Sequence, residues 1–331
     1  MKQNRIGNVK ILVTGGAGYI GSACVELLIM NGYEVAVFDN LTEGHEEAIH
    51  PEASFVKGDL AEKDKIDACL DDHQPDAIIH FAAFALVGES MKNPGKYFTN
   101  NVGNAHNLLE CATKRGIKKF VFSSTCATYG VPESMPMHEG LNQKPINPYG
   151  ESKLMFEKIL HWYQITYNIE PVIFRYFNAA GATKRFGEHH KIETHLIPNV
   201  LKVALGQSEG CQVFGEDYPT PDGTCIRDYI HITDLADAHI RALKPGISGA
   251  FNLGNGDGYS VRQVIDTCRK VTGKEIPFKS LDRRPGDPPI LVANATKAKE
   301  VLGWSPQFAS LEDIIQSAWN WHSKNPNGYL K

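Results

Sequence analysis

Short apolar runs alternate with longer segments of helical period along the first half of the chain. Several of the short runs are apolar at successive positions, as in strands that are buried on both faces of a parallel sheet. Strands are predicted at residues 9–13, 34–38, 54–56, 77–81, 119–123 and 171–175, and helices at 19–31, 62–71, 97–115 and 148–167. Repeated βαβ units of this kind predict a doubly wound parallel α/β sheet that binds its ligands at the carboxyl ends of the strands.

The pattern changes after Asn178. Gly, His, Pro and charged residues become frequent, the elements shorten, and the alternation of strand and helix is lost. We therefore predict a first domain of residues 1–178 and a smaller C-terminal α/β substrate domain of residues 179–331, with segments near 226–250 returning to the first. A cleft between the two is the expected binding site.

Charge and cysteine usage exclude several classes of partner. The 331 residues carry a formal net charge of -4, which gives no reason to expect nucleic acid or an anionic membrane as a partner. The seven cysteines form no C-x-x-C pair, as expected of reduced thiols, and no stretch is apolar for long enough to cross a bilayer. We expect a soluble, cytoplasmic protein. The histidines, His189 and His190 included, lack metal-ligand spacing, so no metal is predicted.

A glycine-rich turn follows the first predicted strand and opens the first predicted helix. Gly15 permits a tight turn, Gly18 lets a pyrophosphate approach the backbone, and Gly21 lets helix and strand pack closely. The N–H groups of the helix N-terminus favour phosphates. Asp39 ends the second strand, where a carboxylate accepts hydrogen bonds from ribose hydroxyls and repels a 2′-phosphate. This pattern predicts a Rossmann-type site for NAD rather than NADP, although Asp39 could instead cap the turn at 39–41.

Tyr149 and Lys153 form a Y-x-x-x-K pair on the predicted helix at 148–167. Residues four apart share a helical face, so the phenol and the ammonium can address one site. A free phenol titrates near about 10. A nearby ammonium and a positive nicotinamide ring would lower the pKa of Tyr149 towards the working range of a base. The strand at 119–123 leads into the hydroxyls of Ser123, Ser124 and Thr125, which either cap the backbone or take part in the chemistry.

Residues 14–21 resemble the opening of the extended short-chain dehydrogenase/reductases, with their G-x-x-G-x-x-G spacing. Nearly the whole chain resembles the UDP-hexose 4-epimerases of that family. The related 4,6-dehydratases carry an Asp-Glu pair after the catalytic hydroxyl, whereas this chain has Cys126 and Ala127, which cannot act as the required acid and base. The segments that carry the closer resemblance lie at 175–178, 195–198, 214–218, 222–231, 283–287 and 319–322.

The resemblance implies an enzyme that inverts C4 of UDP-galactose and UDP-glucose through a 4-keto intermediate, with NAD as a retained cofactor. Thr125, Tyr149 and Lys153 would be catalytic, with Thr125 binding the O4 of the sugar and passing its proton to Tyr149. The implied NAD contacts are Gly15, Gly18, Tyr19, Ile20, Gly21, Asp39, Asn40, Asp59, Leu60, Phe81, Ala82, Asn100, Ser123, Tyr149, Lys153 and Tyr176. The implied sugar-nucleotide contacts are Thr125, Tyr149, Asn178, His195, Leu196, Phe214, Arg227, Arg284, Asp287 and Leu291.

Among these residues, Arg227 and Arg284 suit a diphosphate, which prefers bidentate and permanently charged partners, although either could form a surface ion pair instead. Two positions depart from the family. Ala85 replaces a lysine that contacts the nicotinamide ribose in some relatives, so NAD would be held less tightly. Leu291 replaces a bulky tyrosine, so the site would also admit the 2-acetamido group of UDP-GalNAc and UDP-GlcNAc. The family is commonly a homodimer joined through two helices, here 97–115 and 148–167.

Three other interpretations stay open. The substrate could be a UDP-pentose or UDP-glucuronate, although no extra cation or hydroxyl cluster is evident for a uronate carboxylate. The enzyme could be a dehydrogenase that releases NADH to an external acceptor. The chain could also be a non-catalytic NAD-binding module, but such proteins typically lose the tyrosine or the lysine, and both are present here.

Overall fold

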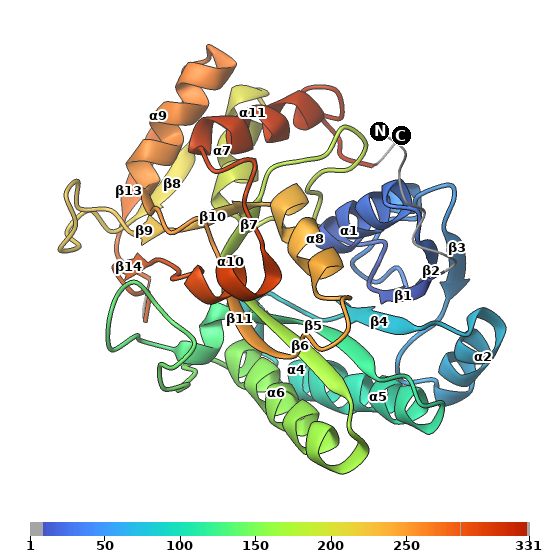
Figure 1. Cartoon of the computed structure of the whole chain (residues 1–331). Coiled ribbons are helices and arrows are strands. Elements are labelled where there is room, and N and C mark those ends of the chain that lie inside the picture. Colours follow the sequence, from blue (N-terminus) through green and yellow to red (C-terminus); the bar gives the residue numbers. More distant parts are fainter. Residues whose placement is uncertain (1–8, 285, 330–331) are drawn as a thin grey trace.

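A seven-stranded parallel sheet forms the centre of the molecule (Figure 1). The computed structural model describes residues 9–284 and 286–329; the outer ends of the two predicted domains, 1–8 and 330–331, and position 285 lie outside the described residues. The strand order is β11-β6-β5-β4-β1-β2-β3, and the predicted doubly wound α/β architecture is confirmed. The strands are β1 (Lys10–Thr14), β2 (Glu34–Asp39), β3 (Ser54–Lys57), β4 (Ala77–His80), β5 (Lys119–Thr125), β6 (Glu170–Tyr176) and β11 (Gly249–Leu253).

Helices cover both faces of this sheet (Figure 1). One face packs against α1 (Tyr19–Met30), α8 (Ile232–Arg241) and α10 (Thr296–Leu302), and the other against α2 (Lys63–His73), α5 (Ala105–Lys114) and α6 (Pro148–Tyr167). Successive side chains of β1 alternate between the two cores: Ile11 and Val13 join the first, and Leu12 joins the second. Because both faces are covered, β5 is buried along its whole length, which explains the continuously apolar runs in the sequence.

The predicted helix at 97–115 is wrong as a continuous α-helix. The chain forms α4 (Pro94–Phe98), a π-helical segment η2 (Thr99–Asn104) and then α5. Within the π-helical segment Asn101 turns inward: its amide accepts a hydrogen bond from the N–H of Phe84 at 2.9 Å and donates to Ser152 of α6 at 3.1 Å. Widened turns of this kind occur where a side chain must be re-aimed, often near functional sites, and apolar periodicity does not reveal them.

Shorter elements after Asn178 build a second core, which begins at the carboxyl end of β6. The chain then returns to the central sheet, because α8 packs on α1 and β11 pairs with β6 in parallel. The strands of the second region form three small sheets: β7 (Asn178–Ala180) with β10 (Tyr229–His231), β8 (Cys211–Phe214) with β13 (Phe278–Leu281), and β9 (Ile226–Arg227) between β12 (Tyr259–Ser260) and β14 (Ile290–Leu291). Its helices are α7 (Leu196–Ala204), α9 (Val261–Thr272) and α11 (Leu311–His322).

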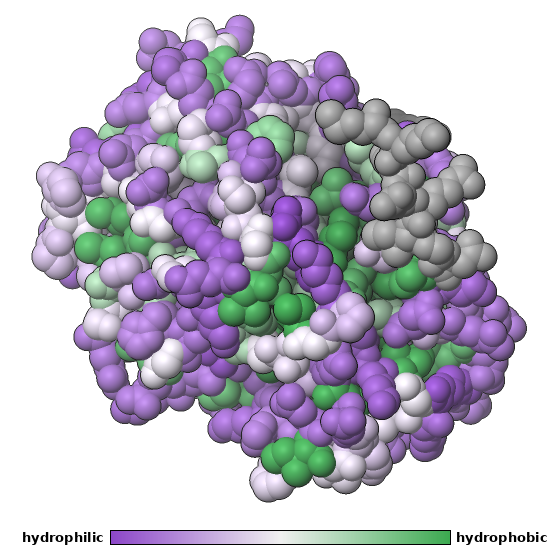
Figure 2. All heavy atoms as spheres, in the orientation of Figure 1, coloured by the Kyte–Doolittle hydropathy of each residue, from purple (hydrophilic) through white to green (hydrophobic). Residues whose placement is uncertain are grey.

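The surface is polar over most of the face seen in Figure 2, where apolar side chains lie in small separate groups. Within residues 9–284 and 286–329, no helix combines the length and the hydrophobicity needed to cross a bilayer. Isolated apolar side chains on a protein surface are ordinary, whereas a continuous patch indicates a contact with a partner.

Candidate active site

The turn between β1 and α1 has no room for side chains at two of its glycines. Gly15 has a φ of +75°, and a Cβ atom there would lie 2.5 Å from the backbone nitrogen of Ala82. A Cβ atom at Gly21 would lie 2.1 Å from the carbonyl oxygen of Gly15. The turn therefore requires glycine at both positions, and it brings the first turn of α1 against β1 and the end of β4.

The N-terminus of α1 presents backbone donors to the carboxyl edge of the sheet. Gly18 precedes the helix and has no side chain to cap it, so the N–H groups of Tyr19 and Ile20 are available to an anion. The ring of Tyr19 points elsewhere, because its hydroxyl donates a hydrogen bond to the carbonyl oxygen of Gly181 at 2.6 Å. Tyr19 thus connects the glycine turn to the segment that follows β7.

Asp39 lies at the end of β2 and is buried. Its carboxylate accepts hydrogen bonds from the N–H groups of Ala17 at 3.0 Å and Leu41 at 2.8 Å. Burial raises the pKa of Asp39, and the hydrogen bonds from Leu41 and Ala17 oppose that rise. The aspartate therefore does cap the turn, and each oxygen keeps a second lone pair for a ribose hydroxyl.

The other implied cofactor residues lie along the same edge. The side chain of Asn40 donates to Asp59 at 2.7 Å, which links the end of β2 to the segment after β3. The hydroxyls of Ser123 on β5 and Tyr176 on β6 are hydrogen bonded to each other. Leu60 is buried after β3, Phe81 and Ala82 follow β4, and Asn100 lies in the π-helical segment.

Three catalytic candidates meet at the carboxyl end of β5. Lys153 is 2% exposed, and its ammonium donates a hydrogen bond to the carbonyl oxygen of Ser123 at 2.7 Å. Thr125 ends the strand, two residues beyond the predicted boundary, and its hydroxyl accepts a hydrogen bond from the N–H of Ala127 at 3.1 Å. The same hydroxyl acts to lower the pKa of Tyr149. The structure thus brings Thr125, Tyr149 and Lys153 together from a strand and a helix that are adjacent in space.

The start of α6 determines where its two catalytic candidates lie. The side chain of Asn147 caps the helix by accepting a hydrogen bond from the N–H of Gly150 at 2.8 Å, and Pro148 occupies the first turn. Tyr149 then falls in the first turn and Lys153 one turn further along the same face.

Burial dominates the ionisation of both side chains. It raises the pKa of Tyr149 to about 12, although the hydrogen bond with Thr125 opposes the rise. It lowers the pKa of Lys153 to about 7, against the charge of Glu157. In the chain by itself, desolvation thus penalises the charged forms of both side chains. The expected lowering of the pKa of Tyr149 by Lys153 and the nicotinamide ring stays a prediction for the occupied site.

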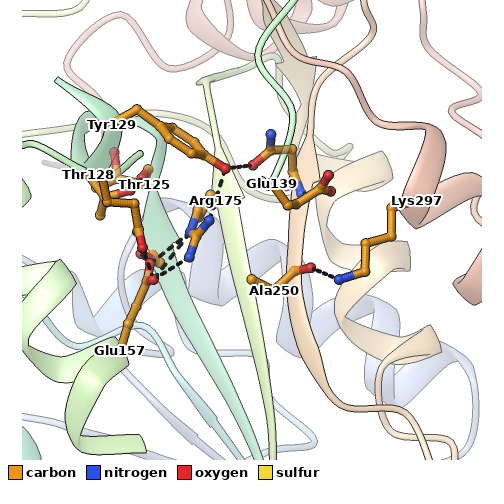
Figure 3. Close-up of polar contacts among 11 residues, drawn as sticks. Thr125, Thr128, Tyr129, Glu139, Glu157, Arg175, Ala250 and Lys297 are labelled. Carbon is orange, nitrogen blue, oxygen red and sulfur yellow. Dashed lines mark hydrogen bonds and ion pairs between the residues drawn. The ribbon is translucent and has the colours of Figure 1, made fainter. Parts of the chain in front are cut away.

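A buried polar network lies behind the catalytic groups (Figure 3). Glu157 of α6 pairs with Arg175 of β6 at 2.6 Å, and the two side chains are only 5% and 7% exposed. Arg175 also donates a hydrogen bond to the hydroxyl of Tyr129 at 3.0 Å, which in turn donates to Asn252 of β11 at 2.7 Å. Burial alone lowers the pKa of Arg175, but Glu157 raises it overall. The network connects α6 with three segments of the sheet region.

A cavity of about 600 Å³ lies in the second region, beyond the end of β6. Seven of the ten implied sugar-nucleotide contacts line it: Asn178, His195, Leu196, Phe214, Arg227, Arg284 and Asp287. Thr125, Tyr149 and Leu291 are not part of its lining. Asn199 and Lys202 line it as well, and sequence analysis missed both; they follow Leu196 at helical spacing on α7, which is the signal that could have found them.

The two arginines of the cavity are each held by a neighbouring side chain. Arg227 and Asp287 form an ion pair, so in this state the arginine is held by a carboxylate of the same chain. The guanidinium of Arg284 stacks over the ring of Phe214, 3.9 Å from its centre. A bound diphosphate would have to compete with Asp287, and a bound base would have to take the place of Arg284 over Phe214.

The two positions that depart from the family lie in different surroundings. Leu291 pairs with Arg227 in the register of β14 and β9, and it packs with Cys126 against the cluster of Tyr129 and Phe177. It is therefore close to the catalytic end of β5, although it lies outside the lining of the cavity. Ala85 is exposed in the segment after β4.

Four potential metal ligands also converge beside this cavity. The ligand atoms of Glu188, His190, Glu193 and His195 lie within 4.8 Å of one another. The spacing of the histidines predicts no metal ligands, because these four residues lie in one loop and not at the spacing of a known metal motif. Burial alone lowers the pKa of His195, but Glu188 and Glu193 raise it to about 10.

Comparison with known proteins gives a consistent result over nearly the whole chain. The model of the NAD-dependent epimerase/dehydratase family matches residues 11–254. The UDP-glucose 4-epimerase of Halalkalibacterium halodurans is 52% identical over 325 residues, which cover 96% of this chain and 97% of that protein.

Two solved structures give the same result. The UDP-glucose 4-epimerase of Bifidobacterium longum in complex with NAD+ and UDP is 38% identical, with a TM-score of 0.92 over 97% of this chain and 100% of its own. The UDP-Glc/GlcNAc 4-epimerase of Campylobacter jejuni is 40% identical, with a TM-score of 0.85 over 96% of this chain and 100% of its own.

Glu157→Gln should destabilise the protein strongly, because it leaves the guanidinium of Arg175 buried without its counter-charge. We expect the free energy of unfolding to fall by about 3–5 kcal/mol in chemical denaturation. Glu312→Gln is the matched control, since it removes an ion pair with Lys270 whose side chains are both more than half exposed, and it should leave stability nearly unchanged. Equal effects of the two substitutions would contradict a structural role for the buried pair.

Proposed function

This chain belongs to the NAD-dependent epimerase/dehydratase family, and we propose that it interconverts UDP-galactose and UDP-glucose by inverting C4 through a 4-keto intermediate. The observation that carries the proposal is the convergence of Thr125, Tyr149 and Lys153 at one end of the sheet, between a glycine turn and an arginine-lined cavity. Neither Cys126 nor Ala127, which follow Thr125, can support the elimination chemistry of a dehydratase.

The residues of the sheet edge fit NAD. The glycine turn exposes backbone N–H groups to a pyrophosphate, and the buried carboxylate of Asp39 disfavours a 2′-phosphate. Lys153, Asn100 and Tyr176 would hold the nicotinamide half, without the lysine that Ala85 replaces. When bound, the oxidised nicotinamide supplies a hydride acceptor for C4 and a positive charge that favours the phenolate of Tyr149.

Tyr149 acts as the base that takes the proton of the 4-hydroxyl, and it returns the proton when C4 is reduced from its other face. Thr125 binds O4 and relays the proton to the phenol, while the ammonium of Lys153, held by the carbonyl of Ser123, stabilises the phenolate. The high pKa of Tyr149 in the chain by itself keeps the phenol protonated at neutral pH. The base is thus formed only when cofactor and substrate have entered the site.

The cavity of the second region would hold the UDP part of the substrate. Arg227 and Arg284 bind the diphosphate, whose phosphate groups can each accept two hydrogen bonds from a planar guanidinium. Phe214 packs against uracil, and Asp287 accepts from the ribose once its pairing with Arg227 is exchanged. Asn178, His195 and Leu196 complete these contacts. Because UDP is held firmly, the 4-ketose can rotate in the site between the two hydride transfers.

The hexose pocket would also accept an N-acetyl group. Leu291 packs with Cys126 beside the catalytic strand end, and its side chain is smaller than the tyrosine of relatives confined to unsubstituted hexoses. The Campylobacter jejuni enzyme, whose name includes both UDP-Glc and GlcNAc, shares this fold at 40% identity. We therefore extend the proposed substrates to UDP-GalNAc and UDP-GlcNAc.

The proposed enzyme is a homodimer that pairs through α5 and α6. A shallow groove between α6 and the end of the π-helical segment with the start of α5 is lined by Val102, Gly103, His106, Ile159, Trp162 and Tyr163. Along the same helix, the side chains of Trp162 and Ile165 are 65% and 60% exposed. Large apolar groups gathered on one helical face are typical of a surface that a second protein covers.

Purified protein should convert UDP-galactose to UDP-glucose with no added NAD, as followed by the anomeric signals in proton NMR. Tyr149→Phe should reduce kcat by about 10²–10⁴-fold, because the site loses its base. Tyr167→Phe, an exposed position on the same helix, is the control and should behave as wild type. No conversion even with added NAD would move the assignment to a pentose or uronate nucleotide, and stoichiometric NADH release would indicate a simple dehydrogenase.

Leu291→Tyr should reduce the kcat/KM for UDP-GalNAc by about 10–100-fold and leave that for UDP-galactose within a few-fold of wild type. The larger side chain would occupy the space of the acetamido group. The ratio of the two values in a coupled assay is the measurement. Undetectable turnover of UDP-GalNAc by the wild-type enzyme, alongside robust turnover of UDP-galactose, would rule out the extended substrate range.

Light scattering after size-exclusion chromatography should give twice the chain mass at micromolar concentration. Trp162→Glu should convert this species to monomer, because a charge in the centre of an apolar interface is costly to bury. Met30→Glu is the control, since Met30 is equally exposed, at 64%, but lies at the end of α1. A wild-type monomer, or a dimer that both variants retain, would reject this interface.

A further inference from the structure

The loop that leads into α7 carries the sequence Glu188-His189-His190-Lys191-Ile192-Glu193-Thr194-His195. Four of these side chains, from Glu188, His190, Glu193 and His195, turn to the same side, so that one ligand atom of each lies within 4.8 Å of all the others. The proposed epimerisation uses none of them except His195 as a lining residue of the cavity.

The carboxylate of Glu188 is the informative member of this cluster. It is 5% exposed, and among the residues that the structure describes its Oε1 atom has no aligned hydrogen-bond partner, like the Nε2 atom of His190. Yet Oε1 lies 2.9 Å from Nδ1 of His195 and 3.2 Å from Nε2 of His190. A buried carboxylate oxygen is costly to leave without a hydrogen bond. Nδ1 of His195 is hydrogen bonded to Glu193 at 2.9 Å, whereas Oε1 of Glu188 lies close to both imidazoles and is aligned on neither.

The composition and spacing of the cluster match a tetrahedral metal ion. Zinc binds imidazole nitrogens and carboxylate oxygens at about 2.0–2.2 Å, which places neighbouring ligand atoms about 3.3–3.6 Å apart. The separations of 2.9 and 3.2 Å require small outward movements of the side chains, and the other separations, all within 4.8 Å, are also near this range. Two carboxylates and two neutral imidazoles also balance the charge of a divalent ion. We propose that Glu188, His190, Glu193 and His195 bind a divalent transition metal, with Zn²⁺ as the preferred ion.

The position of this site gives it a role in ordering the substrate pocket. His195 precedes the first residue of α7, and Glu188, Glu193 and His195 all line the cavity. On the other side, the ring of His190 lies 6.1 Å from that of Tyr19, which opens α1 after the glycine turn and is hydrogen bonded to Gly181. A metal ion here would hold together the loop that lies between the NAD site and the UDP cavity. Its role would be structural and not catalytic.

Zinc content and spectroscopy of the full-length protein test the proposal independently of activity. After treatment with a strong chelator, the wild-type chain should bind about one equivalent of Zn²⁺ in competition with a chromophoric chelator. Co²⁺ in its place should give the intense visible absorption of tetrahedral coordination. The absence of a thiolate charge-transfer band would exclude the seven cysteines as ligands. Absence of Zn²⁺ binding, or a weak octahedral Co²⁺ spectrum, would show an ion-pair cluster held by protons and would overturn the site.

Variants identify the ligands. Glu188→Gln combined with His190→Asn should weaken Zn²⁺ binding at least 100-fold, whereas His73→Asn at the end of α2 should leave it unchanged. His190→Cys should retain tetrahedral Co²⁺ and gain a thiolate-to-cobalt band in the near ultraviolet, which only a folded site with position 190 as a ligand can produce. Unchanged binding in the double variant, or no new band in His190→Cys, would overturn the assignment. Epimerisation of UDP-galactose can succeed or fail without changing these readouts.

Discussion

The buried pairing of Glu157 with Arg175 is the contact on which the arrangement of the active site depends. It fastens α6 to β6 at a point one turn beyond Lys153, so the helix that carries the proposed base and its ammonium cannot slide along the sheet. Arg175 extends the connection through Tyr129 to Asn252 of β11. Each ion would be costly to bury without the other, since the cost of desolvating it exceeds what a single hydrogen bond returns. The negative charge of Glu157 also opposes the fall in the pKa of Lys153 that burial causes.

The parallel sheet brings the other residues of the proposed site next to this anchored helix. All seven strands end at the same edge, so the glycine turn after β1, Asp39 after β2 and Thr125 at the end of β5 face a common space although they are far apart in sequence. The side chains proposed to perform the chemistry come from β5 and α6, where Thr125 and Lys153 are buried and Tyr149 is partly exposed. Those that line the cavity of the second region come from short strands and loops, and several of them pair with one another in this state. Reacting groups on the central sheet and an adjustable UDP pocket suit the proposed reaction, in which the nucleotide stays bound while the sugar rotates.

Burial sets the chemistry of the two groups that the reaction would use. Burial raises the pKa of Tyr149 to about 12 and lowers that of Lys153 to about 7, because a low-dielectric site disfavours both charged forms. A site with this property becomes basic only when positive charge enters it. The same principle applies to the cluster around Glu188, where two carboxylates are kept together by cations, either protons on imidazoles or the proposed metal ion.

The sequence by itself determined the features that depend on neighbouring residues. The apolar runs, the glycine turn, the start of α6 at Asn147 and the Y-x-x-x-K pair follow from local backbone geometry and from helical or extended period, and the structure has each of them. The tertiary structure decided what depends on distant groups. The π-helical segment at 99–104 exists because Asn101 must reach Phe84 and Ser152, and the raised pKa of Tyr149 comes from everything that surrounds it. The pairing of Arg227 with Asp287 and the convergence of four ligands before α7 likewise arise from packing, because contact energies depend on distances in space and not on separations along the chain.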